Sequence, residues 1–146
     1  MNAVKFLLKE HNKVRNTFAD ISDESHREET KRKMFNALCE DLIRHETMEQ
    51  KIWYPHLKNN EILADVIKHL ISEEKSAAEA IKEFKTIKTE EEWIKKFVKL
   101  RNDVEHHAAE EEQKLFPKVE KMLDETKLEK IGKEMREFKS EYKEVS

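Results

Sequence analysis

The feature that most constrains the fold is an internal repeat. Residues 35–55 and residues 97–117 share one pattern of aromatic, aliphatic, acidic and histidine residues, offset by 62 positions. The superposed pairs are Phe35 and Phe97, Leu38 and Leu100, Asp41 and Asp103, Leu42 and Val104, His45 and His107, Glu49 and Glu111, Tyr54 and Phe116, and Pro55 and Pro117. An offset of 63 positions relates residues 4–18 to residues 67–81 in the same way. We therefore expect two helical hairpins, which pack together as a bundle.

Apolar residues recur at helical spacing along most of the chain. One glycine and two prolines leave few of the residues that turns and strands use. Thr89 with Glu92, and Thr126 with Glu129, have the form of capping boxes that open helices. The expected helices cover residues 2–21, 35–53, 63–84, 89–117 and, as a shorter C-terminal helix packed across the outside, about 127–142. The expected fold is all-α, a single domain over residues 1–146 with a four-helix core at about 2–117.

Charge and apolar patterning narrow the classes of function. The 29 basic and 32 acidic residues are interspersed, so no basic stripe is available to neutralise phosphates. Apolar runs reach only three or four residues, far below the roughly 20 that cross a bilayer. The N-terminus also has no signal-peptide core. We expect a soluble, cytoplasmic protein with neither a nucleic-acid nor a membrane partner.

The single cysteine, Cys39, excludes an internal disulfide and a cysteine-based metal site. We expect Cys39 to be a packing residue beside the core. Any metal must therefore be held by histidines and carboxylates. His26 and His56 are expected at the surface, and Trp53 and Tyr54 are expected to pack at the end of the bundle.

Polar residues occupy inward positions in the middle of each apolar stripe. They are His11 in the first helix, His45 and Glu49 in the second, Glu74 in the third, and His107 and Glu111 in the fourth. Burial of an unpaired carboxylate costs several kcal/mol, a large share of the about 5–15 kcal/mol that stabilises a domain. A shared cation would compensate all six groups. In the third helix, Glu73 or His69 replaces Glu74 if that helix is rotated by part of a turn.

The repeated spacing of histidine and glutamate also suits metal binding. Residues four apart lie one turn from each other on the same helical face, so two opposing pairs can bind two ions on the bundle axis. Imidazole with carboxylate suits iron, manganese or zinc, whereas calcium and magnesium favour oxygen ligands alone. We expect a pair of irons, and zinc or manganese remains open. His106 and Glu110, which lie out of this register, are expected to form a solvated or outer pair.

Three segments resemble the hemerythrin-like, or HHE cation-binding, family. Residues 45–55 and 107–117 match its doubled motif of histidine, glutamate four later and an aromatic-proline pair at ten. Residues 7–15 match its first-helix histidine segment. The resemblance implies an up-and-down four-helix bundle around a non-haem, oxo- or hydroxo-bridged di-iron centre. The ligands it implies are His11, His45, Glu49, His107 and Glu111.

The third helix departs from the family pattern. The family commonly has one or two histidines there, and this chain has Glu74 at the aligned position. Three histidines and three carboxylates favour the ferric state, which argues against the reversible oxygen carriage of the histidine-rich relatives. The site is instead expected to resemble those of iron-oxidising and peroxide-handling bundles.

The expected function is therefore a metal-binding protein whose two irons bind or react with oxygen, peroxide or nitric oxide, or which senses iron or oxygen. An alternative is a peroxide-decomposing or iron-oxidising enzyme that uses the same residues. A second alternative is a metal-free helical interaction module. A small diatomic molecule or peroxide is the expected partner, and the sequence leaves the oligomeric state open.

Overall fold

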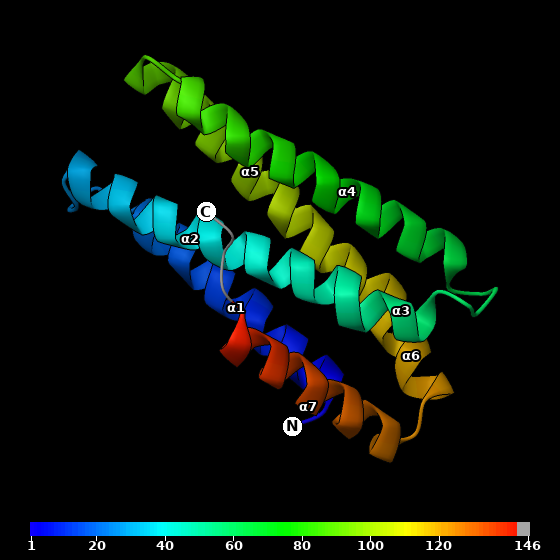
Figure 1. Ribbon diagram of the computed structural model, residues 1–146. Coiled ribbons are helices and arrows are strands. Elements are labelled where there is room, and N and C mark those ends of the chain that lie inside the picture. The colour runs from blue at the N-terminus through cyan, green and yellow to red at the C-terminus, as the bar shows by residue number, and fades with distance from the viewer. Residues whose placement is uncertain (143–146) are drawn as a thin grey trace.

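The computed structural model describes residues 1–142, and all regular secondary structure in this range is helical (Figure 1). In chain order the elements are α1 (Ala3–Ile21), α2 (Glu28–Met48), the π-helical turn η1 (Glu49–Trp53), α3 (Tyr54–Leu57), α4 (Ala64–Glu83), the 3-10 turn η2 (Phe84–Thr86), α5 (Glu90–Glu110), the π-helical turn η3 (Glu111–Leu115), α6 (Phe116–Met122) and α7 (Glu125–Glu141). The all-α prediction is confirmed. No helix in the described part of the chain is long and apolar enough to cross a membrane.

The four long helices form two antiparallel hairpins. Helix α1 packs on α2 and helix α4 packs on α5, and the hairpins meet through contacts of α1 with α5 and of α2 with α4 (Figure 1). This is the up-and-down bundle that the internal repeat and the family resemblance predicted. Each repeat copy forms the second helix of its hairpin, so the two motifs enter the bundle from opposite hairpins.

Helix α7 is the additional C-terminal helix, and it packs alongside α1 on the outside of the bundle (Figure 1). It begins at Glu125 because the side chain of Asp124 accepts a hydrogen bond from the backbone N–H of Lys127 at 2.8 Å. The sequence prediction placed this start about two residues later, with Thr126 as the cap, and was wrong on this point. The predicted cap at Thr89 is confirmed, since its hydroxyl accepts from the N–H of Glu92 at 3.2 Å.

Both prolines lie within continuous helical segments. Proline lacks an N–H and its ring clashes with the carbonyl four residues earlier, which disfavours a regular α-turn. The chain accommodates this by widening: the N–H of Tyr54 bonds to the carbonyl of Glu49, and Phe116 bonds in the same way to Glu111. The core helices therefore run past Pro55 and Pro117 through π-helical turns, and the second one continues to Met122.

Two apolar clusters fill the two ends of the bundle. One contains Leu7, Trp53 and Tyr54, and the other contains Phe35 and Phe97. Cys39 belongs to the second cluster, and the predictions of packing roles for Cys39, Trp53 and Tyr54 are confirmed. The layer between the two clusters holds the charged side chains considered next.

Candidate metal centre

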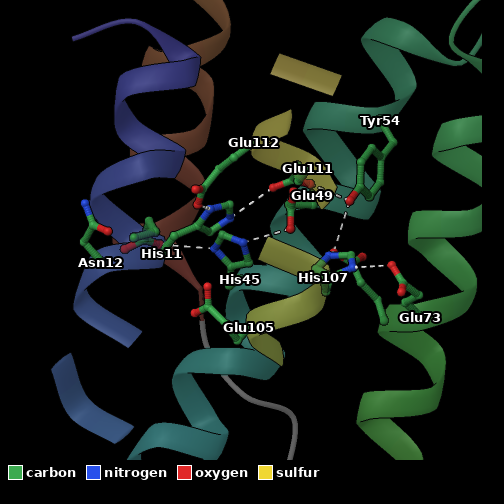
Figure 2. Close-up of polar contacts among 12 residues, drawn as sticks. His11, Asn12, His45, Glu49, Tyr54, Glu73, Glu105, His107, Glu111 and Glu112 are labelled. Carbon is green, nitrogen blue, oxygen red and sulfur yellow. Dashed lines mark hydrogen bonds and ion pairs between the residues drawn. The ribbon is translucent and has the colours of Figure 1, made fainter. Parts of the chain in front are cut away.

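Figure 2 shows His11, His45, Glu49, His107 and Glu111 gathered between the helices. Together with Glu74 they are the six inward residues predicted from the sequence, and they meet between the two apolar clusters. They come from all four long segments: His11 from α1, His45 from α2, Glu49 from η1, Glu74 from α4, His107 from α5 and Glu111 from η3. The three carboxylates are at most 1% exposed. Both π-helical turns start at a glutamate of this layer, so the local widening caused by each proline begins where a carboxylate points inward.

These six residues form two overlapping groups of potential metal ligands. His11, His45 and Glu111 each offer an atom within 4.8 Å of the others, and so do Glu49, Glu74, His107 and Glu111. Glu111 belongs to both groups. Because one carboxylate has two oxygens, it can serve two neighbouring ions, and the arrangement therefore suits a pair of cations.

Each histidine points its Nε2 atom toward an inner carboxylate. The contacts are His11 Nε2 to Glu111 Oε1 at 3.1 Å, His45 Nε2 to Glu49 Oε1 at 2.8 Å, and His107 Nε2 to Glu74 Oε2 at 3.1 Å. The three Nε2 atoms thus face the same interior layer, which is the orientation that coordination through Nε2 requires.

Each histidine also points its Nδ1 atom toward an outer carboxylate. The contacts are His11 to Glu112 at 2.7 Å, His107 to Glu73 at 3.2 Å, and His45 to Glu10 at 3.7 Å. Metal-binding histidines commonly have such a partner, because it fixes the ring orientation and the tautomer and strengthens the ligand. The sequence prediction missed these partners, although each one directly adjoins a predicted site residue in sequence.

Two cations hold the outer carboxylates in turn. Arg15 contacts Glu112 at 2.9 Å, and Lys139 of α7 contacts Glu10 at 2.8 Å. Burial raises the pKa of Glu10, but its contacts with His45 and Lys139 outweigh this and lower the pKa to about 2. Helix α7 therefore contributes to the surroundings of the site through Lys139.

Hydrogen bonds from neutral groups fix the inner carboxylates. The hydroxyl of Tyr54 donates to Glu111 Oε2 at 2.8 Å and lies 3.3 Å from Glu74 Oε2. The amide of Gln50 donates to Glu74 Oε1 at 3.1 Å. Tyr54 thus has a polar role in addition to packing, which the sequence prediction did not include.

Several buried ligand atoms in this layer make no hydrogen bond of suitable geometry among the described residues, although His11 Nε2 and His45 Nε2 lie within ion-pair distance of Glu111 and Glu49. The atoms without such a hydrogen bond are His11 Nε2, both ring nitrogens of His45, both carboxylate oxygens of Glu49, and Glu111 Oε1. A buried polar group without a hydrogen bond costs about 1–3 kcal/mol, so protons or a cation that satisfy these atoms would stabilise the layer. All of these atoms are of types that bind transition metals. The donor set therefore fits a cation.

Without a metal, protons held by Glu49 and His107 compensate part of the negative charge of the carboxylates, as the directions of their pKa shifts indicate. Burial, together with the nearby Glu111 and Glu74 carboxylates, raises the pKa of Glu49 well above its usual value. Burial lowers the pKa of His107, but its hydrogen bond to Glu74 and the charge of Glu111 raise it to about 9. A bound cation would displace these protons.

The chain matches the family model described as the hemerythrin HHE cation binding domain over residues 2–119. This chain belongs to the hemerythrin HHE family. As a member of this family it is a cation-binding domain, and the His and Glu clusters lie inside the matched region. Among curated proteins and solved structures, no significant match is found.

A cavity of about 610 Å³ leads from the surface of this hemerythrin-like domain to the candidate centre. The inner residues that line it are His11, His45, Glu74 and His107, and the apolar ones are Val14, Phe18, Leu42, Ala77, Val104 and Ala108. Exposed residues such as Asn102 and Glu105 also line it, so it reaches solvent. Glu46 lies on its wall, and burial followed by the charge of Glu74 raises the pKa of Glu46 to about 8.

His26 and His56 lie away from this centre, whereas His106 lines the cavity that leads to it. His26 pairs with Asp20 at 3.2 Å and His56 pairs with Glu134 at 2.9 Å, both near the surface as predicted. His69, the alternative ligand on α4, has a side chain that is 58% exposed. Of the three candidates on that helix, Glu74 lies in the inner layer beside His107 Nε2. Glu73 lies outside that layer and contacts His107 at Nδ1.

Proposed function

We propose that this domain holds two iron ions and reacts through them with a small oxidant such as oxygen or peroxide. The observation that carries the proposal is the pair of overlapping ligand groups that share Glu111. In this assignment His11, His45 and Glu111 would hold one ion, and His107, Glu74 and Glu111 would hold the other. Glu49 contacts His45 of the first group and belongs to the second group, so it would be within reach of either ion.

The redox assignment rests on charge. When bound, two irons supply electrons to a small oxidant, which zinc ions do not. Three inner carboxylates and three outer ones surround the site, and among the described residues only Glu112 and Glu10 of these are paired with a cation, Arg15 or Lys139. The remaining negative charge near a metal stabilises its more highly charged state. The centre should therefore favour the diferric state. The cavity gives a small molecule access, while the apolar clusters exclude water from the two ends of the site.

Metal content provides the first test. Protein purified from iron-supplemented cells should hold about two irons per chain, and His45→Ala or His107→Ala should lower both the iron content and the thermal stability. The two decrease together because binding free energy at a core site is also folding free energy. His56→Ala, which alters a histidine outside the site, is the control. Unchanged iron content in both site variants would contradict the ligand assignment.

The reaction with oxygen provides the second test. The protein is reduced without air, exposed to oxygen and then freed of oxygen, while its visible spectrum is recorded. We expect a stable diferric spectrum that returns to the diferrous one only when a reductant is added, because the carboxylates favour the ferric ions. Recovery without a reductant would instead establish reversible oxygen carriage. Continued consumption of added peroxide would identify the domain as a peroxide-decomposing enzyme.

A further inference from the structure

A second pair of histidine and glutamate residues lies on the outer surface of the α4–α5 hairpin. His69 and Glu73 are four residues apart on α4, and His106 and Glu110 are four residues apart on α5. Each pair has the spacing of the inner motifs, so each places both side chains on one helical face. Because α4 packs on α5, the two pairs face each other across the hairpin.

His69, Glu73 and Glu110 come together as potential ligands, and His106 contacts both carboxylates. The Nε2 atom of His69 lies 3.3 Å from Glu110 and 3.6 Å from Glu73, and the Nε2 atom of His106 lies 3.6 Å from Glu73 and 2.5 Å from Glu110. His69, Glu73 and Glu110 each offer a ligand atom within 4.8 Å of the others. Small rotations of these side chains would bring the atoms to the distances found around a bound transition metal.

In this cluster the carboxylates are much more buried than the imidazoles that contact them. The imidazoles are 58% and 64% exposed, whereas the Glu73 and Glu110 side chains are only 20% and 11% exposed. Within the described residues, neither carboxylate forms an ion pair with lysine or arginine, and their ion-pair partners are histidines alone. Two partly buried carboxylates thus lie beneath two accessible imidazoles without a permanent positive charge between them.

We propose that His69, Glu73, His106 and Glu110 form a surface site for one divalent transition-metal ion of the Zn²⁺ or Fe²⁺ class. Two imidazoles and two carboxylates are a complete tetrahedral set for such an ion, and a set that Ca²⁺ and Mg²⁺ do not favour. The site is separate from the inner centre but adjoins it. Glu73 contacts the surface histidines through Oε2 and the inner His107 through Oε1.

The test uses the iron-loaded full chain and adds Zn²⁺ in equilibrium dialysis, with iron and zinc measured in the same samples. We expect one zinc per chain in addition to the iron. The double substitution of His69→Ala with His106→Ala should weaken this binding at least tenfold, and Glu110→Ala should weaken it similarly. Both histidines are largely exposed, so the double histidine variant should keep its helix content and iron content. Glu73 is left unchanged because it also contacts His107.

His56→Ala is the matched control, since His56 is a surface histidine with a single glutamate partner. It should bind zinc as the unchanged protein does. The proposal is overturned if the unchanged protein binds no additional zinc, or if the double variant binds it with equal affinity. If His45→Ala lost zinc binding and the double variant kept it, the zinc would belong to the inner site, and the proposal of a surface site would be overturned. If the inner site held no iron, only the proposed function would be contradicted. The surface site would still be tested, because zinc bound there is recognised by its loss in the double variant.

Discussion

Glu73 and Glu74 are neighbours on α4 but have different surroundings, because successive helical residues point about 100° apart. Glu74 is 1% exposed and contacts His107 Nε2, whereas Glu73 contacts the Nδ1 atom on the other side of the same ring. One turn earlier, the side chain of His69 is 58% exposed and, within the described residues, forms ion pairs only with the outer carboxylates of Glu73 and Glu110. The register of this helix therefore decides which side chain can reach the inner ions.

Glu74→Ala should lower the iron content and change the visible spectrum, because it removes an inner carboxylate. His69→Ala should leave both unchanged, which makes it the matched control on the same helix. In metal-free protein, Glu74→Ala should lower the melting temperature, since it removes the hydrogen-bond partner of Gln50 and leaves the mostly buried His107 without its inner carboxylate. Spectral change in His69→Ala alone would mean that α4 is rotated from the register described here.

The inner residues could be predicted from the sequence because they repeat and because they interrupt apolar stripes. The outer carboxylates could not, since each serves a histidine on a different helix. Glu10 adjoins His11 in sequence yet faces His45, and Glu112 adjoins Glu111 yet faces His11. Such pairing depends on how adjacent helices are rotated, and a periodicity pattern does not contain that information. An acidic neighbour beside His11, Glu74 and Glu111 was nevertheless a usable signal.

At the scale of elements, the sequence prediction did not include the way in which the chain passes its two prolines. Proline was expected to disfavour a simple continuation of the helix. The helix does continue at both prolines, but through a wider, π-helical turn and without a break. Both motifs place proline six residues after the inner glutamate, so the two π-helical turns occur at equivalent positions. The repeat thus specifies a backbone feature as well as a set of side chains.

Helix α7 docks on the start of α1 through the only glycine in the chain. A Cβ atom added at Gly132 would lie 2.7 Å from the Met1 carbonyl oxygen and 2.9 Å from the backbone nitrogen of Ala3. Arg136 also donates a hydrogen bond to the Met1 carbonyl at 2.7 Å. The close approach of the two backbones therefore requires a residue without a side chain.

Gly132→Ala should destabilise the protein by about 1–3 kcal/mol, because the new methyl group is forced against backbone atoms. In an open helical position the same change would stabilise by about 1 kcal/mol, so the sign of the effect is diagnostic. Denaturant unfolding measures it, with the exposed Lys133→Ala as a control on the same helix. A gain in stability would show that α7 does not pack against the N-terminal residues in this way.

At the scale of the whole molecule, the two hairpins were predicted from the repeat, but the cavity between them was not. Its position follows from differences between aligned residues: Ala77 of α4 aligns with Val14 of α1, and Val104 of α5 aligns with Leu42 of α2. In both pairs the smaller residue lies on the α4–α5 hairpin. The space that these smaller side chains leave depends on the distance between helices, which the sequence alone does not give.

If a small oxidant reaches the irons through this cavity, then narrowing it should slow the reaction without removing the metal. Ala77→Val and Ala77→Phe add progressively larger side chains to its wall, so the rate of oxidation of the reduced protein should fall in the order Ala, Val, Phe. An added barrier of about 1.4 kcal/mol, which corresponds to a tenfold slower rate, is the size of effect we expect for Phe. Stopped-flow mixing with oxygen or peroxide measures the rate, and the iron content of each variant is determined in parallel.

Ala78→Phe is the matched control for this series, because Ala78 is adjacent on α4 but lies outside the cavity lining. It should oxidise at the rate of the unchanged protein. The graded decrease should be steeper for an organic peroxide than for oxygen, since a larger molecule is more sensitive to the width of the path. A fully iron-loaded Ala77→Phe protein that reacts as fast as the unchanged one would show that the oxidant enters elsewhere.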